Sequence, residues 1–375
     1  YVLATIAALS LLVVVSNSYM LSQQPAESGV ESYWVVHDAG ASVPDDSMLW
    51  RQGEHVDAGM TTNQVDFKLV IAEFSSAQYV TVAPAYLDTV EFEFFDQYGD
   101  TLNRDIMGDK EPHQLAAYHY YVGRFLVEIP SDAASARIKI RSTQNVAVSL
   151  NFLSRDILVK ESAFSLIMIS MVLFIIMGAV IASFIAGFWL KQPLFFAFAA
   201  HQLICFATLV ALSNLVPSFW PDFNQINGVA LGALSIYLLI TGAVFHWLVL
   251  RDMVAARWLD SVIGTVVLIT FVNLAIYFFV DQNIGIISSN ITTALLAVGL
   301  ISFIPRTSPK DKIQGFIFKK IRIFYSLLML LVAIGSLSQL GFGQYPLVNF
   351  SLYTLVSLIV LAIILQLRTT ISHRR

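Results

Sequence analysis

The side chains best suited to chemistry lie between residues 30 and 130, where aromatic and acidic residues occur close together. A site for a sugar or another small ligand needs aromatic platforms and polar groups that converge on one surface. The candidates for such a site are Trp34, Trp50, Asp88, Glu91, Glu93, Tyr118, His119, Tyr120 and Tyr121. The competing interpretation places Trp50 and alternate tyrosines in a core or an interface. It treats Glu91 and Glu93, two residues apart on one strand face, as solvated carboxylates.

Catalysis and metal binding find little support in the same region. No Ser/His/Asp, Walker or zinc-hydrolase pattern occurs there, so we expect this part of the chain not to be an enzyme. The acidic residues Asp100, Asp105, Asp109 and Glu111 lack the spacing of a calcium loop, which leaves Ca²⁺ as a minor alternative. The single cysteine, Cys205, cannot build a disulfide or a zinc cluster within one chain. We therefore predict no metal and no cofactor.

Composition indicates that most of the chain lies in a membrane. Its 375 residues are 57% hydrophobic and only 13% charged, which is too little charge for the surface of a soluble protein. The long apolar runs come after residue 162, whereas residues 22–160 have the mixed composition of a soluble domain. The net charge is −4, and no Lys/Arg block lies beside aromatic residues, so we expect no nucleic-acid binding.

Seven apolar runs are long enough to cross about 30 Å of hydrocarbon as helices of roughly 20 residues. They cover residues 163–190, 193–216, 226–250, 258–280, 284–304, 317–341 and 347–367. Small residues recur at four-residue spacing within two of these runs, which favours close packing inside one bundle; a homodimer face is the alternative. These small residues are Gly178, Ala182 and Ala186 in the first run, and Gly228 and Gly232 in the third.

The loops between the runs predict their orientation, because Lys and Arg accumulate on the cytoplasmic side of a membrane. The loops VPSFWPDFNQIN, VDQNIG and GFGQYP contain neither residue. The opposite loops and the C-terminal end contain twelve, namely Lys191, Arg251, Arg257, Arg306, Lys310, Lys312, Lys319, Lys320, Arg322, Arg368, Arg374 and Arg375. We therefore expect the first span to start outside and the seventh to end in the cytoplasm.

Ionisable groups are scarce within the predicted spans, where they would be costly and usually functional. Only His201 and His246 lie inside a span. The simplest interpretation of His201 is a polar side chain hydrogen-bonded between helices, and the alternative is a pH-sensing or ligand role. Asn273, Asn290 and Gln339 offer further interhelical hydrogen bonds. This scarcity argues against a proton pump, an ion-coupled transporter or a voltage sensor.

The sequence of residues 22–160 predicts β strands. Apolar and charged residues alternate in Ala136–Arg141 and in Val90–Phe94, which is the period of a strand with one buried face. Several short strands at this spacing, separated by turns such as DQYGD at 96–100, favour an all-β sandwich or jelly roll. The further predicted strands lie at 66–72, 78–83, 123–130 and 146–152.

The predicted domain boundaries follow from these patterns. Residues 1–21 are a signal sequence or an N-terminal membrane anchor, and the start at Tyr1 without Met or a basic flank suggests a trimmed N-terminus. The β domain covers 22–160 and the helix domain 161–370, with 371–375 starting a cytoplasmic tail. The segment SRDILVKESA, at 154–163, joins the last strand to the first span, and it is too short to be a flexible linker.

This layout resembles the bacterial seven-transmembrane receptors with diverse intracellular signalling modules, the DISM family. Residues 80–109, VTVAPAYLDTVEFEFFDQYGDTLNRDIMGD, are similar to the second type of DISM extracellular domain, and LWRQGEHVDAGM, GRFLVEIP and ARIKIRS occupy the places of its other strands. Residues 319–368 are similar to the family's last two helices, including the short outer loop that ends in a proline and is followed by Asn349. The resemblance extends from about residue 45 to 370.

The resemblance implies a sensor in a bacterial inner membrane, with the β domain in the periplasm binding carbohydrate or another small ligand. The helices would relay the signal to a cytoplasmic diguanylate cyclase or histidine kinase. This chain has neither motif and stops at Arg375, so we expect an excerpt of a longer protein or a receptor with a separate signalling partner. The alternatives are a transporter for a neutral substrate and a membrane-complex subunit that uses the β domain for docking.

Overall fold

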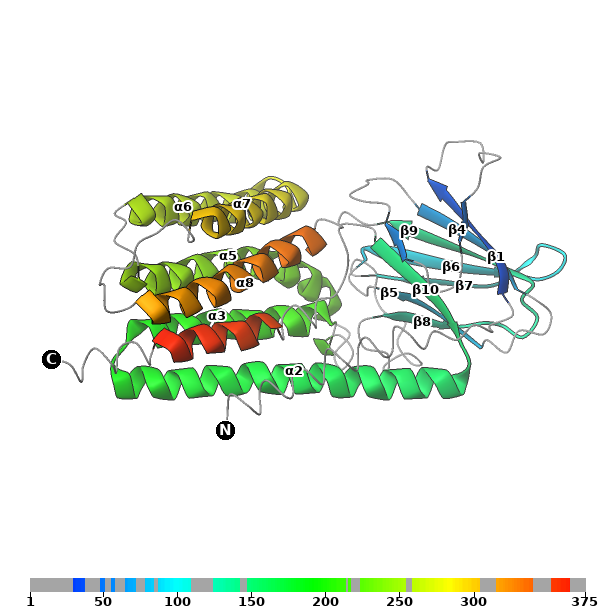
Figure 1. Ribbon diagram of the computed structural model, residues 1–375. Coiled ribbons are helices and arrows are strands. Elements are labelled where there is room, and N and C mark those ends of the chain that lie inside the picture. Colours follow the sequence, from blue (N-terminus) through cyan, green and yellow to red (C-terminus); the bar gives the residue numbers. More distant parts are fainter. Residues whose placement is uncertain are drawn as a thin grey trace. The chain divides into compact units, whose positions relative to one another are not determined.

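The computed structural model describes two compact units, one built on β strands and one on helices. The strands, the start of helix α2 up to Ile169, and residues Val210–Leu231 belong to the first unit; Ser170–Leu209 and the chain from Gly232 belong to the second (Figure 1). Residues 1–29 and 365–375, and with them the predicted leader and tail, lie outside the described residues. The residues that the structure describes are 30–37, 48–50, 55–57, 65–71, 78–83, 87–108, 124–141, 147–213, 215–216, 223–253, 258–303, 315–339 and 352–364.

Two antiparallel sheets form the β unit. The larger sheet has the strand order β2-β1-β4-β9-β6-β7, and the smaller has the order β3-β10-β5-β8. The strands are β1 (Val30–His37), β2 (Met48–Trp50), β3 (His55–Asp57), β4 (Val65–Ile71), β5 (Tyr79–Ala83), β6 (Thr89–Phe95), β7 (Thr101–Met107), β8 (Phe125–Glu128), β9 (Ser135–Arg141) and β10 (Ala147–Leu153).

The strand pairing is nested like one long hairpin. β6 pairs with β7, β5 with β8, β4 with β9, and β3 with β10, all antiparallel. Two further antiparallel pairs, β5·β10 and β6·β9, join these four strand pairs into the two sheets. The chain therefore passes from one sheet to the other at most of its turns.

Alternating side chains build a core between the two sheets. In β6, Val90, Phe92 and Phe94 are buried while the residues between them are half-exposed, and β9 repeats this pattern. Because alternate residues of a strand point to opposite faces, each sheet turns one apolar face inward. The core cluster draws buried residues from β5, β8 and β10 of one sheet and from β6, β7 and β9 of the other.

The strand predictions at 66–72, 78–83, 90–94, 123–130, 136–141 and 146–152 are confirmed by β4, β5, β6, β8, β9 and β10. Strand β1 was not predicted, and β7 was not predicted from its own alternation. The segment LWRQGEHVDAGM, which the resemblance placed at strand positions, contains β3 and most of β2. β7 lies at a sheet edge and is exposed along most of its length, so its sequence, TLNRDIM, needs no apolar alternation. β1 has an irregular register between Val30 and Ser32, which interrupts its period.

Two glycines shape the β6–β7 hairpin. At its tip, the Asp96 carboxylate accepts hydrogen bonds from the backbone N–H groups of Tyr98 (2.8 Å) and Asp100 (2.9 Å), and Gly99 has φ +87°. Gly108 follows β7 with φ +151°, directly against the backbone of Asp88. Positive φ favours glycine, and at Gly108 the close backbone contact also leaves no room for a Cβ.

Long apolar helices form the second unit and confirm a helical membrane region. The helices are α2 (Arg155–Leu190), α3 (Pro193–Leu212), α5 (Asn224–Met253), α6 (Trp258–Phe279), α7 (Gln282–Phe303) and α8 (Gly315–Gln339). Five of them, α2 to α7, are long and apolar enough to cross a membrane. The described residues include two shorter apolar helical windows, Arg322–Ile334 and Leu352–Ile364, where the last two spans were predicted.

The first predicted span begins earlier than expected. α2 starts at Arg155 rather than at residue 163, so the expected domain boundary at 160/161 falls inside this helix. Ser154 precedes it at the N-cap position, and Asp156 lies in its positively polarised first turn. With 36 residues α2 is about 54 Å long, which exceeds the roughly 30 Å of the hydrocarbon core.

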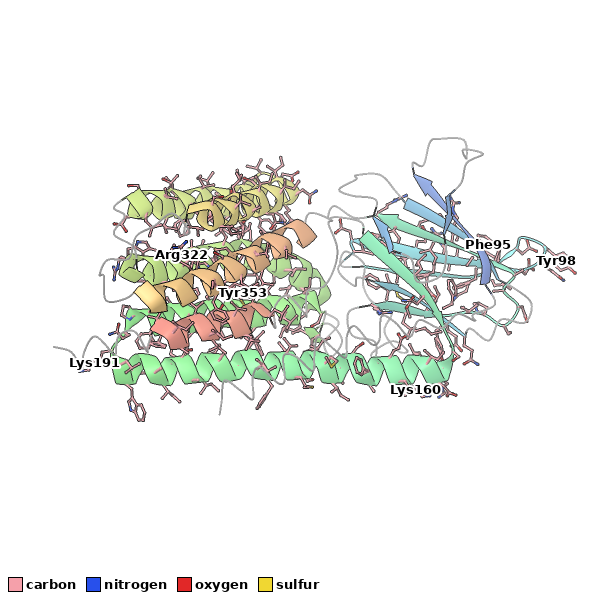
Figure 2. The ribbon with its side chains drawn as sticks, viewed as in Figure 1. Phe95, Tyr98, Lys160, Lys191, Arg322 and Tyr353 are labelled. Atoms are coloured by element: carbon pink, nitrogen blue, oxygen red, sulfur yellow. The ribbon has the colours of Figure 1, made fainter. Side chains whose placement is uncertain are left out.

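A two-residue turn connects α2 to α3. Lys191 takes φ +50° just after the last residue of α2, the conformation that commonly ends a helix, and Pro193 begins α3 with a ring that suits the first helical position (Figure 2). Because so short a turn returns the chain at once, α2 and α3 are neighbouring antiparallel helices.

Helices α2, α3, α5, α6, α7 and α8 and the segment Leu352–Ile364 contribute to one apolar core in this unit. Many large apolar side chains nevertheless remain exposed, such as Phe279 at 86% on α6 and Phe188 at 71% on α2. A water-soluble bundle would not expose so much apolar surface. Lipid contact accounts for this surface.

Replacing Gly108 by Ala should destabilise the β unit more than replacing Gly99. Gly99→Ala introduces only the strain of positive φ, about 1–2 kcal/mol, because a Cβ there meets no atom within 4 Å. Gly108→Ala adds a collision with the Asp88 carbonyl, so we expect a loss of about 3 kcal/mol or more. Hydrogen–deuterium exchange of β6 and β9 peptides measures both losses. Equal protection in the two variants would contradict the close contact.

Candidate functional site

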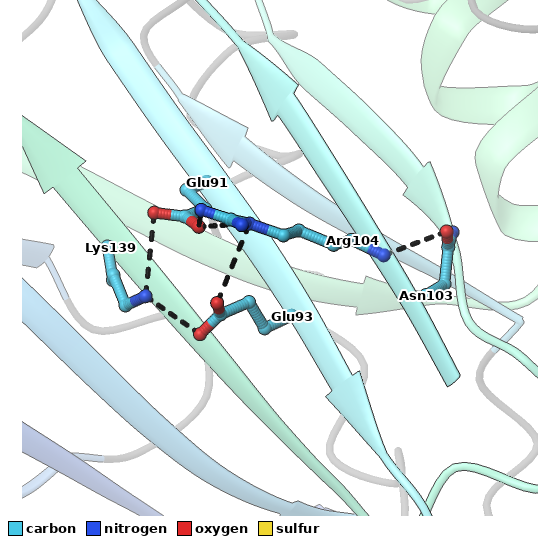
Figure 3. Close-up of polar contacts among 5 residues, drawn as sticks. All are labelled: Glu91, Glu93, Asn103, Arg104 and Lys139. Carbon is cyan, nitrogen blue, oxygen red and sulfur yellow. Dashed lines mark hydrogen bonds and ion pairs between the residues drawn. The ribbon is translucent and has the colours of Figure 1, made fainter. Parts of the chain in front are cut away.

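An ion-pair network lies on the outer face of the six-stranded sheet. Glu91 and Glu93 project from β6 between Arg104 of β7 and Lys139 of β9 (Figure 3). The Lys139 ammonium lies 2.8 Å from Glu93 Oε2 and 3.5 Å from Glu91 Oε2. Arg104 donates from Nε to Glu91 Oε1 and lies 3.7 Å from Glu93. The two carboxylates are therefore paired and mostly shielded, and not simply solvated as their spacing suggested.

The surroundings of Glu91 alter its acidity. Partial burial by itself would raise the pKa of this carboxyl, because the charged form loses hydration. The hydrogen bond from Arg104 and the positive charges of Lys139 and Arg104 outweigh that effect, so the pKa of Glu91 is lowered. Glu91 thus stays ionised over a wider pH range than a free glutamate.

Strand register places Trp34, one of the predicted aromatic residues, in a row of charged residues that crosses the six-stranded sheet and includes Glu93 and Arg104. We call it the charged row. Trp34 lies opposite Lys68, Lys68 opposite Arg137, Arg137 opposite Glu93, and Glu93 opposite Arg104. Residues directly opposite in an antiparallel sheet share a face. Trp34 and Glu93 therefore occupy one row across five strands, which combines one aromatic residue, three cationic residues and one carboxylate.

Trp50 belongs to a different row. It lies opposite Tyr33, and that row continues through Leu69 and Ala136 to Phe94. Ala136 and Phe94 are buried in the core, so this row faces the core at β9 and β6. The register thus separates Trp50 from Trp34.

Of the other predicted ligand residues that the structure describes, Glu91 lies opposite Lys139 in another row of the same sheet face, and Asp88 lies outside the strands. Asp88 precedes β6 and is only 7% exposed, with its backbone against Gly108. His119, Tyr120 and Tyr121 lie outside the described residues, as does Tyr118. Within the described part of the chain, no group of three or more His, Cys, Asp or Glu side chains is arranged to hold a metal ion.

The end of the β unit is clamped to the start of α2. One residue, Ser154, separates β10 from this helix. Leu158 of α2 packs with Leu126 of β8 and Leu153 of β10 in a small buried cluster. Arg124, next to β8, also lies 3.8 Å from Glu161 on the second turn of α2. The first two turns of α2 are therefore fastened to the strand region around β8 and β10.

A buried polar cluster lies inside the helical unit. His201 of α3 contacts Thr241 of α5 through Nδ1 (2.9 Å) and Tyr353 of the segment Leu352–Ile364 through Nε2 (2.8 Å). The Tyr353 hydroxyl also lies 3.4 Å from His246 Nε2. The His201 ring packs closely over Gly242. The interpretation of His201 as a hydrogen-bonded group between helices thus has specific partners.

Neighbouring residues repeat the contact between the same two helical segments. Thr354 donates a hydrogen bond of 3.0 Å to Gln202 Oε1, next to the pair of His201 and Tyr353. Sequence reasoning missed Gln202, Tyr353 and Thr354. The adjacent polar pair His201-Gln202 inside an apolar run was the available signal, but hydroxyl residues are too common in membrane helices to identify their partners.

The small residues predicted for helix packing fall into two groups. Gly232 of α5 lies against Tyr277 of α6 so closely that a Cβ would collide with the tyrosine ring. On α2, Ala186 packs against the apolar core, whereas Gly178 is exposed and meets no atom of the described chain within 4 Å of a Cβ. Ala182 is exposed as well, and Gly228 is half-buried.

Of the predicted interhelical amides, Asn273 of α6 accepts a hydrogen bond of 2.9 Å from Ser288 of α7. Asn290 is buried in α7. The side chain of Gln339 lies outside the described residues. Asn273 thus joins α6 to α7 without bringing a charge into the bilayer.

Acid should destabilise the β unit through Glu91. Its pKa is lower in the folded state than the value of about 4.3 in an unfolded chain. Its contribution to stability is therefore complete above that value and is lost as the pH falls from there through the folded pKa. Hydrogen–deuterium exchange of β6 between pH 6 and 3 measures this loss.

Lys139→Met provides the matched variant for this experiment. It removes the cation that both carboxylates share, so we expect a loss of roughly 1 kcal/mol at neutral pH and a weaker acid dependence. Lys160→Met, at an exposed position of α2, is the control and should change stability by less than about 0.5 kcal/mol. An unchanged acid profile in Lys139→Met would contradict the role of the network.

Comparisons with known proteins identify no relative of this chain. No family model, no curated protein and no solved structure matches the chain. The features that bear on function are therefore the charged face of the six-stranded sheet, the contacts that hold the start of α2 to the β unit, and the buried polar cluster.

Proposed function

We propose that this chain is the input part of a transmembrane signalling receptor of the DISM type. In this proposal the β unit binds a small ligand, a carbohydrate in the first instance, outside the cytoplasm. The helices relay the event to a cytoplasmic output, a diguanylate cyclase or a histidine kinase, carried in cis or by a partner. The chain's own residues perform no catalysis.

The continuity between β10 and α2 is the observation that carries the proposal. A receptor needs a stiff element that joins its sensor to its membrane domain, and a helix that continues without a break supplies one. The packing of Leu158 and the ion pair of Glu161 fasten the first two turns of α2 to β8 and β10. A docking domain on a flexible tether would not need such fastening.

The strand order supports a jelly roll as the fold of the sensor. A jelly roll is a long hairpin of eight strands rolled into two four-stranded sheets. The nested pairs from β3·β10 to β6·β7, and the orders β3-β10-β5-β8 and β4-β9-β6-β7, correspond to this plan. Strands β1 and β2 extend the second sheet. Many lectins use this fold, which is why we propose a carbohydrate as ligand.

The charged row is the ligand surface that we propose on this fold. Sugars bind through stacking on an aromatic ring together with charged or polar groups that hold the hydroxyls. Trp34 and Glu93 share one register row on the larger sheet, and Lys139 orders the carboxylates beside them. Trp50, in the row that faces the core, is not included in this surface.

Seven spans and an exported β unit complete the proposal. The loop charges support this orientation, because Lys191 and Arg322 belong to the basic side, and the loop between α6 and α7 has no Lys or Arg. The apolar window within α8 and the segment Leu352–Ile364 are the proposed sixth and seventh spans. A bacterial inner membrane with a periplasmic β unit fits this arrangement. The Gly178 and Ala182 stripe on α2 is the proposed homodimer face.

A ligand should raise the melting temperature of the full chain in nanodiscs, since it binds the folded state only. We expect one compound from a panel of neutral sugars, uronic acids, amino acids and Ca²⁺ to do so in a concentration-dependent way. Trp34→Ala should abolish the shift. Tyr98→Ala, at the exposed tip of the β6–β7 hairpin, should retain it (Figure 2).

Two results would count against the receptor. If no compound shifts the melting temperature and none co-purifies, direct sensing of a small molecule is contradicted. If the bound compound accumulates inside proteoliposomes that contain the chain, the transporter alternative is favoured instead.

Alkaline phosphatase fusions test the orientation, because this enzyme is active only outside the cytoplasm. A fusion after Arg368 should be inactive, and a fusion after Asp281, in the loop between α6 and α7, should be active. Activity after Arg368 would reverse the proposed orientation of the whole chain.

A further inference from the structure

The hydroxyl of Thr241 has a defined direction. It lies 3.0 Å from the backbone carbonyl oxygen of Tyr237, 3.4 Å from that of Leu238 and 2.9 Å from His201 Nδ1. A carbonyl oxygen cannot donate, and two oxygens at this distance repel each other unless a proton lies between them. The single hydroxyl proton of Thr241 therefore points to the carbonyl. Its oxygen must accept from His201.

This direction determines the tautomer of His201. The ring is only 4% exposed, and an isolated charge there would be costly, so the imidazole is neutral and has one N–H. Donation to Thr241 places that proton on Nδ1. Nε2 is then an acceptor, and the Tyr353 hydroxyl donates to it across 2.8 Å.

The same reasoning assigns the opposite tautomer to His246. Tyr353 has used its only proton on His201, so its oxygen can only accept from His246 Nε2, at 3.4 Å. His246 is also buried and neutral, with its proton on Nε2. Its Nδ1 is left as a bare acceptor, and it has no partner among the described residues.

A ring that packs against His246 carries a buried hydroxyl donor that has no acceptor among the described residues. Tyr325 of α8 packs edge to face against the His246 ring, with ring centroids 5.5 Å apart. Its hydroxyl is fully buried and likewise has no partner in the described part of the chain. Leaving either group unpaired in an apolar interior costs about 1–3 kcal/mol. A single bridging molecule that accepts from Tyr325 and donates to His246 satisfies both.

We propose that a bound water molecule bridges Tyr325 Oη and His246 Nδ1, and that it completes a one-way hydrogen-bond chain across the helical unit. In this chain every group accepts from the one before it and donates to the next. The order is Tyr325, water, His246, Tyr353, His201, Thr241 and the carbonyl of Tyr237, and it joins α8, α5, the segment Leu352–Ile364 and α3. Water is the ligand because it both donates and accepts within a small space.

The chain is a structural junction and not a path for protons. It ends at a backbone carbonyl, which cannot pass a proton on, so no net transfer along it is possible. Its members depend on one another, because rotating the Tyr353 hydroxyl toward His246 would break the contact with His201 and require new tautomers on both rings. Such a chain polarises cooperatively and holds the four helical segments in one arrangement. This inference does not depend on the receptor proposal.

Nitrogen-15 spectra of the full chain in nanodiscs, labelled at histidine, test the chain directly. We expect His201 to be protonated on Nδ1 only and His246 on Nε2 only, with assignments from His201→Gln and His246→Gln. Magnetisation should pass from water to His246 Nδ1. Identical tautomers, or a doubly protonated ring, would overturn the chain, and no transfer from water would overturn the water site.

Tyrosine variants provide the second test. Tyr325→Phe should shift the His246 Nδ1 resonance, and Tyr353→Phe should lower the melting temperature by about 5 °C because it orphans groups on both histidines. Tyr237→Phe, which keeps the carbonyl and removes only a partly exposed hydroxyl, is the control and should change neither reading. If Tyr353→Phe melts like the wild type with both tautomers unchanged, the chain is excluded.

Discussion

The cost of leaving a polar group unpaired away from water is the constraint on which the rest of the structure depends. In hydrocarbon a backbone must satisfy its own hydrogen bonds, which is why the apolar half of the chain consists of long helices. The same cost explains why the described helices carry charges near their ends, and why the buried polar side chains in the middle meet one another. His201, Gln202, Tyr353 and Thr354 are paired across two helical segments. Each such contact contributes on the order of 1 kcal/mol in a membrane.

The β unit meets the same constraint with charges at its surface. Glu91 and Glu93 share one strand face, where two neighbouring carboxylates repel each other. Lys139 and Arg104, supplied by the strands on either side, turn this repulsion into attraction. The network thereby holds β6, β7 and β9 in register from outside, while Phe92 and Phe94 hold β6 from inside. Both faces of the sheet therefore specify the same pairing.

The junction between β10 and α2 links these two ways of satisfying polar groups. Its backbone passes from ladder hydrogen bonds to helical ones over the single residue Ser154. The leucine cluster and the ion pair of Arg124 with Glu161 then fix the direction in which the helix leaves. The start of α2, β8 and β10 are therefore packed together as one part of the β unit.

The sequence by itself determined the features that depend on composition and period. The strands with alternating residues, such as Val90–Phe94 and Ala136–Arg141, and the five long apolar helices were predictable, because each signal lies within a few consecutive residues. The edge strand β7 was not predictable from its own pattern, since pairing with β6 makes it a strand.

Only the tertiary structure decided which distant residues meet. It separated Trp34 from Trp50 by register, and it gave Glu91 a cation from β9, nearly fifty positions later in the chain. It also brought Tyr353 to His201, 152 positions apart. No local pattern encodes such contacts, because they arise from the packing of whole elements, in which the cost of a buried polar group selects the partner.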